Sequence, residues 1–172
     1  EALLKTVLDA APKAIADPND YAARADLMWA GMLAHNNSCG VGREQDWASH
    51  QIEHELSAFY DCAHGAGLAV ITPRWMRHTL NEKTAPRFAQ YGVRVWGLDA
   101  KADIMETARK AIDRTAEFFT SLGLPSRLSE MGVTDEHFEA MAEHVLKHWF
   151  PLETAFTPLD KAAVIAILKA SL

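Results

Sequence analysis

Apolar residues recur along most of the chain at the three- and four-residue spacing of amphipathic helices, and no stretch of useful length alternates apolar with polar positions. The pattern predicts an all-α fold, a helical bundle-like domain. Helices are expected over about residues 2–15, 21–36, 85–95 and 101–122, with others starting near Asp46, Thr134 and Thr157. Because no repeat or low-complexity linker interrupts the chain, residues 1–172 are predicted to form a single α-helical domain.

Short polar residues mark the expected starts of several helices. Asn19 or Asp20 can accept a hydrogen bond from the first turn of the helix over residues 21–36, and Asp46 can do the same for the helix that follows it. Thr134 can act in the same way for a later helix. The pair Thr157-Pro158 predicts the start of the last helix, because proline suits the first helical position.

Composition and charge narrow the classes of partner. Hydrophobic residues make up 49% of the chain and charged residues 23%, as in an ordinary folded domain. The formal net charge is -6 and no block of basic residues occurs, which argues against nucleic acid or an anionic membrane as a partner. The two cysteines, Cys39 and Cys62, form no CxxC pair, so a reducing cytoplasm is the expected compartment.

The histidines suggest a metal centre. His50 and His54 lie one helical turn apart, which places their side chains about 5–6 Å apart on one face. His64 follows 14 residues after His50, about 21 Å along a continuous helix and too far for a shared ion. A shared site therefore requires the chain to fold back, and residues 60–63 are the expected place. Gly65 and Gly67, which follow, are expected to interrupt the helical pattern. Downstream of this break, proline at position 73 is expected to kink or restart the next helix.

Other interpretations of these histidines compete with a metal site. An i, i+4 histidine pair is often only a helix face, and His144 and His148 repeat the spacing near a helix end without a third partner, so that pair is interpreted as structural. A zinc-protease HExxH fails because no second histidine follows His54-Glu55 at the required spacing, and no GxSxG turn indicates a serine hydrolase. A di-metal carboxylate bundle lacks its Glu-x-x-His pairs, since Gln51 precedes His54.

Longer motifs carry a family resemblance. The run from Asp46 to Gly67 reads DWASHQIEHELSAFYDCAHGAG, and it resembles the signature of the iron-containing (group III) alcohol dehydrogenases, in particular their butanol dehydrogenase-like branch. Further segments similar to that branch are LAVITPRWM from Leu68, YGVRVWG from Tyr91, FFTSLGLP from Phe118 and TPLD from Thr157. The resemblance therefore covers nearly the whole chain.

The resemblance implies a fold and a set of site residues. Such enzymes have an N-terminal α/β domain for NAD(H) or NADP(H) and a helical, dehydroquinate synthase-like C-terminal domain that carries Fe²⁺, sometimes Zn²⁺. His50 and His64 match two of four metal ligands. His54 matches a catalytic histidine near the nicotinamide that serves in proton transfer or substrate positioning. Glu53 or Asp61 could accept a hydrogen bond from a metal-ligating histidine and orient its ring.

The same resemblance sets the functional expectation. The other two ligands, an Asp and a His on a D-x-x-x-H helix, are absent, as is the nucleotide-binding domain. The chain also opens at Glu1 inside a helical pattern, which favours a piece of a longer protein. We expect the C-terminal portion of an NAD(P)-dependent alcohol dehydrogenase acting on a small alcohol or aldehyde, inactive alone and homodimeric at full length. The alternative is a stand-alone helical binding or interaction module that has lost catalysis. An exposed apolar face would indicate a piece, and a polar face a module.

Overall fold

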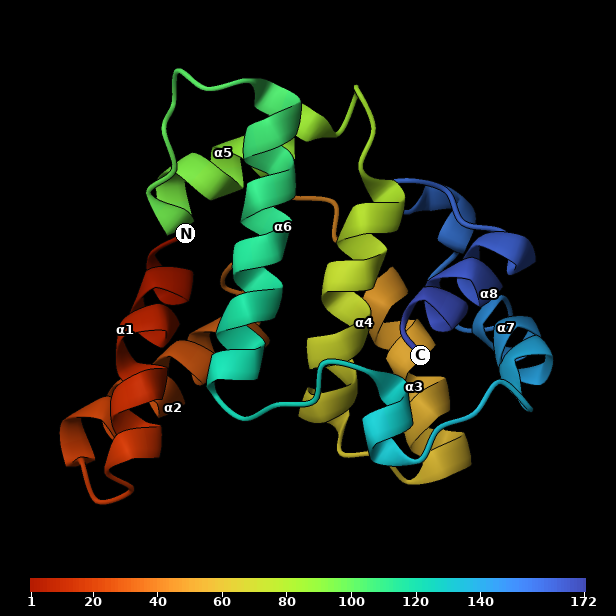
Figure 1. Cartoon of the computed structure of the whole chain (residues 1–172), viewed down its shortest axis with the longest axis horizontal. Helices are drawn as coiled ribbons and strands as arrows, with labels where there is room; N and C mark the ends of the chain where they lie inside the picture. The colour runs from red at the N-terminus through yellow and green to blue at the C-terminus, as the bar shows by residue number, and fades with distance from the viewer.

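The computed structural model describes all residues 1–172 and confirms the all-α prediction, since it contains helices and no strand (Figure 1). The α-helices are α1 (Ala2–Ala16), α2 (Tyr21–His35), α3 (Ala48–Tyr60), α4 (His64–Thr79), α5 (Ala85–Trp96), α6 (Ile104–Ser121), α7 (Phe138–Val145) and α8 (Lys161–Ala170). Two short 3₁₀ turns, Leu128–Met131 and Leu152–Thr154, lie before and after α7. None of the helices is both long enough and apolar enough to cross a membrane.

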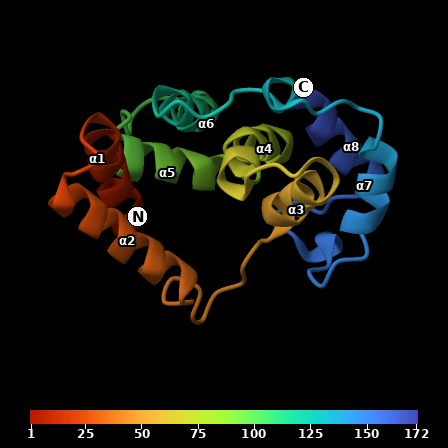
Figure 2. The same cartoon turned by 90° about the horizontal axis from the view of Figure 1, so that it is seen from below.

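The helices form three groups along the molecule (Figures 1 and 2). The antiparallel hairpin of α1 and α2 occupies one end. In the middle, α5 packs against α6, and α4 joins this pair to the far end, where it contacts α3 and α8. There α7 packs against both α3 and α8. Helix α3 therefore has partners on two sides, which fixes the face that carries the histidines.

The main core lies at the α3 end. It contains 18 buried apolar residues, among them Ile52 and Leu56 of α3, Ile71 of α4 and Phe138 of α7. A separate group of six, including Phe88 of α5, joins α4, α5 and α6. Burying a Leu, Ile or Phe side chain contributes roughly 1.5–3 kcal/mol, so α3 is held mainly by its apolar face.

One predicted cap, Asp20, is confirmed, and another, Asp46, is wrong. The Asp20 carboxylate accepts a hydrogen bond from the Ala23 N–H at 3.0 Å, at the start of α2. The Asp46 carboxylate accepts from the Ala48 N–H at 2.7 Å, and its second oxygen accepts from the Phe156 N–H at 2.6 Å. Asp46 is not the cap of α3, because Trp47 holds the N-cap position and makes no side-chain cap bond. Asp46 instead lies one residue earlier and ties the start of α3 to the C-terminal segment.

Two predicted helix starts are wrong. Thr134 caps no helix, because the chain first makes a turn in which the Phe138 N–H bonds to the Asp135 carbonyl, and α7 begins only at Phe138. Thr157-Pro158 does not open the last helix either. The buried Leu159 donates its N–H to the Leu152 carbonyl, and α8 begins at Lys161, capped by the Asp160 carboxylate. In both cases tertiary packing delays the helix past the local signal.

The expected break between the histidines is present. Helix α3 ends at Tyr60, and Asp61 adopts the left-handed region with φ +52°, which reverses the chain into α4 at His64. Gly65 and Gly67 were expected to interrupt the helical pattern, but both lie inside α4. The helix also continues through Pro73 to Thr79, so of the expected kink or restart the restart is excluded.

Candidate metal centre

The three histidines singled out in the sequence converge. The ring centroids of His50 and His64 are 5.5 Å apart, those of His54 and His64 are 5.2 Å apart, and those of His50 and His54 are 6.5 Å apart. Helix α3 presents the first two, and the turn after Tyr60 returns the chain so that the first residue of α4 is the third. His50 is partly buried, whereas His54 and His64 are exposed, so the cluster opens to the surface.

A buried carboxylate supports this cluster. Glu53 is fully buried, and its carboxylate contacts His64 Nδ1 and accepts a hydrogen bond from Ser57 Oγ at 2.8 Å. Because the carboxylate accepts, Nδ1 of His64 carries the proton, and Nε2 keeps its lone pair for a ligand. Of the two residues considered as supports, Glu53 fills that position, and Asp61 instead ends α3.

Gly67 makes room for this carboxylate. A Cβ on Gly67 would lie 2.7 Å from Glu53 Cγ, which is closer than real Cβ atoms approach. A Cβ on Gly65, two residues earlier on the same helix, would meet nothing within 4 Å. The absent side chain at position 67 is therefore part of how Glu53 reaches His64.

The local environment favours a neutral His50. Burial is the main cause that lowers the pKa of His50, and the neighbouring His64 and His54 lower it further. The neutral imidazole is the form that coordinates a metal ion. The electrostatics at His50 therefore suit a ligand.

Two sets of donors can be drawn in this cluster. The resemblance pairs His50 with His64, whereas the nitrogen and oxygen atoms of Glu53, His54 and His64 lie within 4.8 Å of one another. Glu53 is fully buried and already engaged by His64 and Ser57, so its geometry suits a group that orients His64. Imidazole donors of this kind are suited to Fe²⁺ or Zn²⁺.

Two cavities adjoin the segment that leads into α3. One of about 440 Å³ adjoins His50 and is lined also by His35 and Trp47. A larger one of about 850 Å³ is lined by Arg43 and Phe156 among others and contains none of the predicted site residues. Only the smaller cavity borders the histidine cluster.

A second polar group was missed in the sequence. His144 and His148 were interpreted as one helix face without a third partner, but α7 ends at Val145 and both rings contact Glu55 of α3. The contacts join residues 89 and 93 positions apart. The repeated i, i+4 spacing was the only signal of them, because no local pattern links such distant residues.

Fold and site together define an all-α domain with a histidine-rich candidate metal centre. The chain belongs to the Fe-containing alcohol dehydrogenase family and matches its C-terminal part over residues 1–172. It is 42% identical to NADH-dependent butanol dehydrogenase A of Clostridium acetobutylicum, over 99% of this chain and 44% of that protein. It is 35% identical to the NADPH-dependent aldehyde reductase YqhD of Escherichia coli, over 86% of this chain and 38% of that protein.

Solved structures support the same assignment. The NADH-dependent butanol dehydrogenase A of Thermotoga maritima superposes with a TM-score of 0.89 at 30% identity, covering 99% of this chain and 44% of that one. Escherichia coli YqhD superposes with a TM-score of 0.90, also at 30% identity, covering 99% and 43%. The chain therefore spans less than half the length of these relatives.

Proposed function

We propose that this chain is the metal-carrying portion of an alcohol dehydrogenase that interconverts a small alcohol and its aldehyde by hydride transfer with NAD(H) or NADP(H). The observation that carries the proposal is the convergence of His50, His54 and His64 in front of the buried Glu53. The butanol dehydrogenases and the aldehyde reductase among the relatives support the substrate class.

In this proposal His50 and His64 are metal ligands. The pKa of His50 is lowered, and Glu53 leaves Nε2 of His64 free, so both imidazoles suit coordination. The bound Fe²⁺, or alternatively Zn²⁺, would supply Lewis acidity toward the substrate oxygen. Two imidazoles bind a divalent ion less tightly than four preorganised ligands. The proposal therefore assigns the other two of the four ligands to a part of the protein outside these residues.

His54 is proposed as the catalytic residue that faces the cofactor and the substrate. It is exposed, its ring centroid lies 5.2 Å from that of His64, and its imidazole is a side chain that can serve as a general acid or base. The nicotinamide would reach it from a nucleotide-binding domain outside these 172 residues, so residues 1–172 are proposed as one helical domain that is inactive alone.

The surface of α2 favours this proposal over a stand-alone binding module. Tyr21 is 85% exposed, Met28 75% and Trp29 64%, and these side chains follow one another along α2 at helical spacing. A self-sufficient module would carry polar residues on such a face, whereas a domain that packs against further protein leaves an apolar one.

The same proposal includes a cytoplasmic location, which suits the free thiols of Cys39 and Cys62, and a homodimer at full length.

Calorimetry with Zn²⁺ and anaerobic Fe²⁺ tests the ligand assignment. His50→Ala and His64→Ala are each expected to weaken binding by at least about 10-fold, because each removes one of the two donors. His78→Ala, which removes an exposed histidine at the other end of α4, is the matched control and should bind like the parent chain. Equal binding by all four proteins, or aldehyde reduction with NAD(P)H by the 172-residue chain alone, would contradict the proposal.

A further inference from the structure

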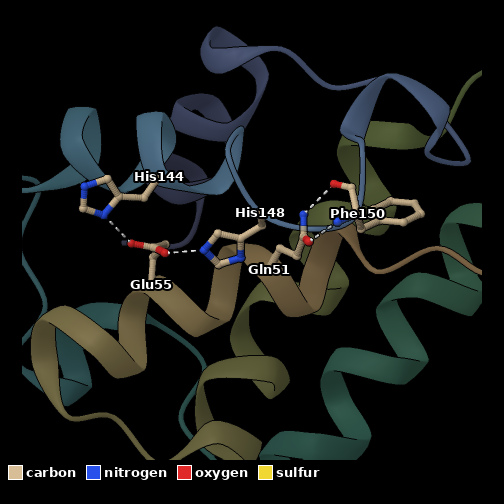
Figure 3. A network of polar contacts seen from close by, with 5 residues as sticks. All are labelled: Gln51, Glu55, His144, His148 and Phe150. Carbon is tan, nitrogen blue, oxygen red and sulfur yellow. Dashed lines mark hydrogen bonds and ion pairs between the residues drawn. The ribbon is translucent and has the colours of Figure 1, made fainter.

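A buried carboxylate lies on α3 beside the candidate metal centre. Glu55 is 5% exposed, and its two oxygens contact His148 Nε2 at 2.8 Å and His144 Nδ1 at 3.1 Å (Figure 3). A carboxylate removed from water needs such partners, since an uncompensated one is strongly destabilising. The two histidines therefore hold specific positions around Glu55.

The segment that carries His148 is attached to α3 a second time. Gln51 is fully buried and lies one turn before Glu55. Its side-chain amide donates to the Phe150 carbonyl at 3.0 Å and accepts from the Phe150 N–H at 2.9 Å (Figure 3). This pair of hydrogen bonds fixes the register of His148 against α3.

Helix α3 thus carries two adjacent polar stripes. His50 and His54 face the histidine cluster, while Gln51 and Glu55 face the segment after α7. His148 lies where the stripes meet, with its ring centroid 6.4 Å from that of His54. Because Glu55 accepts at Nε2, this nitrogen of His148 carries the proton, and Nδ1 is left as an acceptor.

We propose that His148, held by Glu55, is a positioning residue that orients the ring of His54 for its role in hydride-transfer chemistry. The inference rests on the proposed function for what His54 does. The choice of His148 as the residue that orients this ring rests on the proximity of the two rings and on the hydrogen bonds that fix His148. Neither residue is a metal ligand in this assignment.

His144 supplies the matched control. It contacts the same carboxylate as His148, but its neighbouring ring is Phe59, with centroids 5.6 Å apart. Removal of either histidine leaves Glu55 with one partner fewer, so a purely structural role predicts similar losses for both. A positioning role predicts a catalytic loss for His148 only.

The kinetic test uses the full-length dehydrogenase that contains this chain. His148→Ala is expected to lower kcat for aldehyde reduction by about 10- to 100-fold, because a misplaced catalytic group is costly, with a much smaller change in KM. His144→Ala should lower Tm by a similar amount and keep kcat within about 3-fold of the parent. An unchanged kcat in His148→Ala, or an equal kcat loss in both variants, would overturn the proposal.

A second measurement does not depend on activity. In ¹⁵N-labelled protein, His148 should be the Nε2–H tautomer, and the imidazole signals of His54, assigned with His54→Ala, should shift in His148→Ala and not in His144→Ala. Unchanged His54 signals in His148→Ala overturn the positioning role. If the parent enzyme turns over no alcohol or aldehyde, the proposed function fails, and these signals alone decide the inference.

Discussion

The hairpin of α1 and α2 and the site helix α3 are built in opposite ways. The hairpin buries only alanines, namely Ala10, Ala11, Ala23 and Ala30, and exposes large apolar side chains such as Met28 and Trp29. Helix α3 buries Ile52 and Leu56 in the main core, and it also buries the polar side chains Gln51, Glu53 and Glu55. The two regions thus differ in what they bury as well as in how much.

This difference separates a region that buries much apolar area within the domain from one that buries little. Stabilisation by burial scales with apolar area, so alanines contribute little, and the hairpin lacks wide contacts with the other helices. Helix α3 has core on one side and polar anchors on another, which holds the side chains of His50 and His54 in fixed directions. A catalytic group is best supported by such a rigid element.

The largest expected effect is a loss in the free energy of unfolding when a side chain in the core of α3 is truncated. Leu56→Ala removes a fully buried side chain and should destabilise the chain by about 2–5 kcal/mol. Met28→Ala makes a comparable truncation on the exposed face of α2 and should change stability by no more than about 0.5 kcal/mol. Urea denaturation of both variants measures the contrast, and similar losses would show that the hairpin is part of the core.

A smaller effect is expected from one methyl group beside Glu53. Gly67→Ala should destabilise the protein by about 1–3 kcal/mol through overpacking, and should weaken Zn²⁺ binding because the displaced Glu53 no longer orients His64. Gly65→Ala, with open space at its Cβ, should be neutral or stabilising by up to about 1 kcal/mol. Thermal unfolding and calorimetry on both variants test this, and equal behaviour would show that Glu53 moves aside freely.

These residues also show what the sequence could predict. Helical periodicity was sufficient for the all-α fold, because it is a local property of the chain. The grouping of His50 with His64 required the family resemblance, since their spacing alone excluded a shared ion on one helix. The reversal at Asp61 then supplied the geometry.

Other features depend on tertiary contacts that no local pattern contains. Gly67 was expected to break a helix, and its actual role became visible only with the packed position of Glu53. The two contacts of Glu55 join elements far apart in the chain. Thr134 failed as a cap for the same reason, since packing of the buried Phe138 sets where α7 begins.

The smallest effect on stability is expected for the exposed apolar stripe of α2, which consists of Tyr21, Met28 and Trp29. Substitution there should change self-association instead of stability. Met28→Gln combined with Trp29→Gln should leave the free energy of unfolding within about 0.5 kcal/mol per site, because both side chains already face solvent. The same variant should reduce self-association in sedimentation velocity, since a contiguous apolar surface promotes contacts between copies.

Thr120→Gln, at an exposed position of α6, is the control and should change neither quantity. A loss of stability as large as that of Leu56→Ala would mean that the stripe is covered within this chain, and the contrast between the hairpin and α3 would fail. Unchanged stability with reduced association would instead assign the stripe to contacts with other protein, as expected for a helical domain that works against a nucleotide-binding partner.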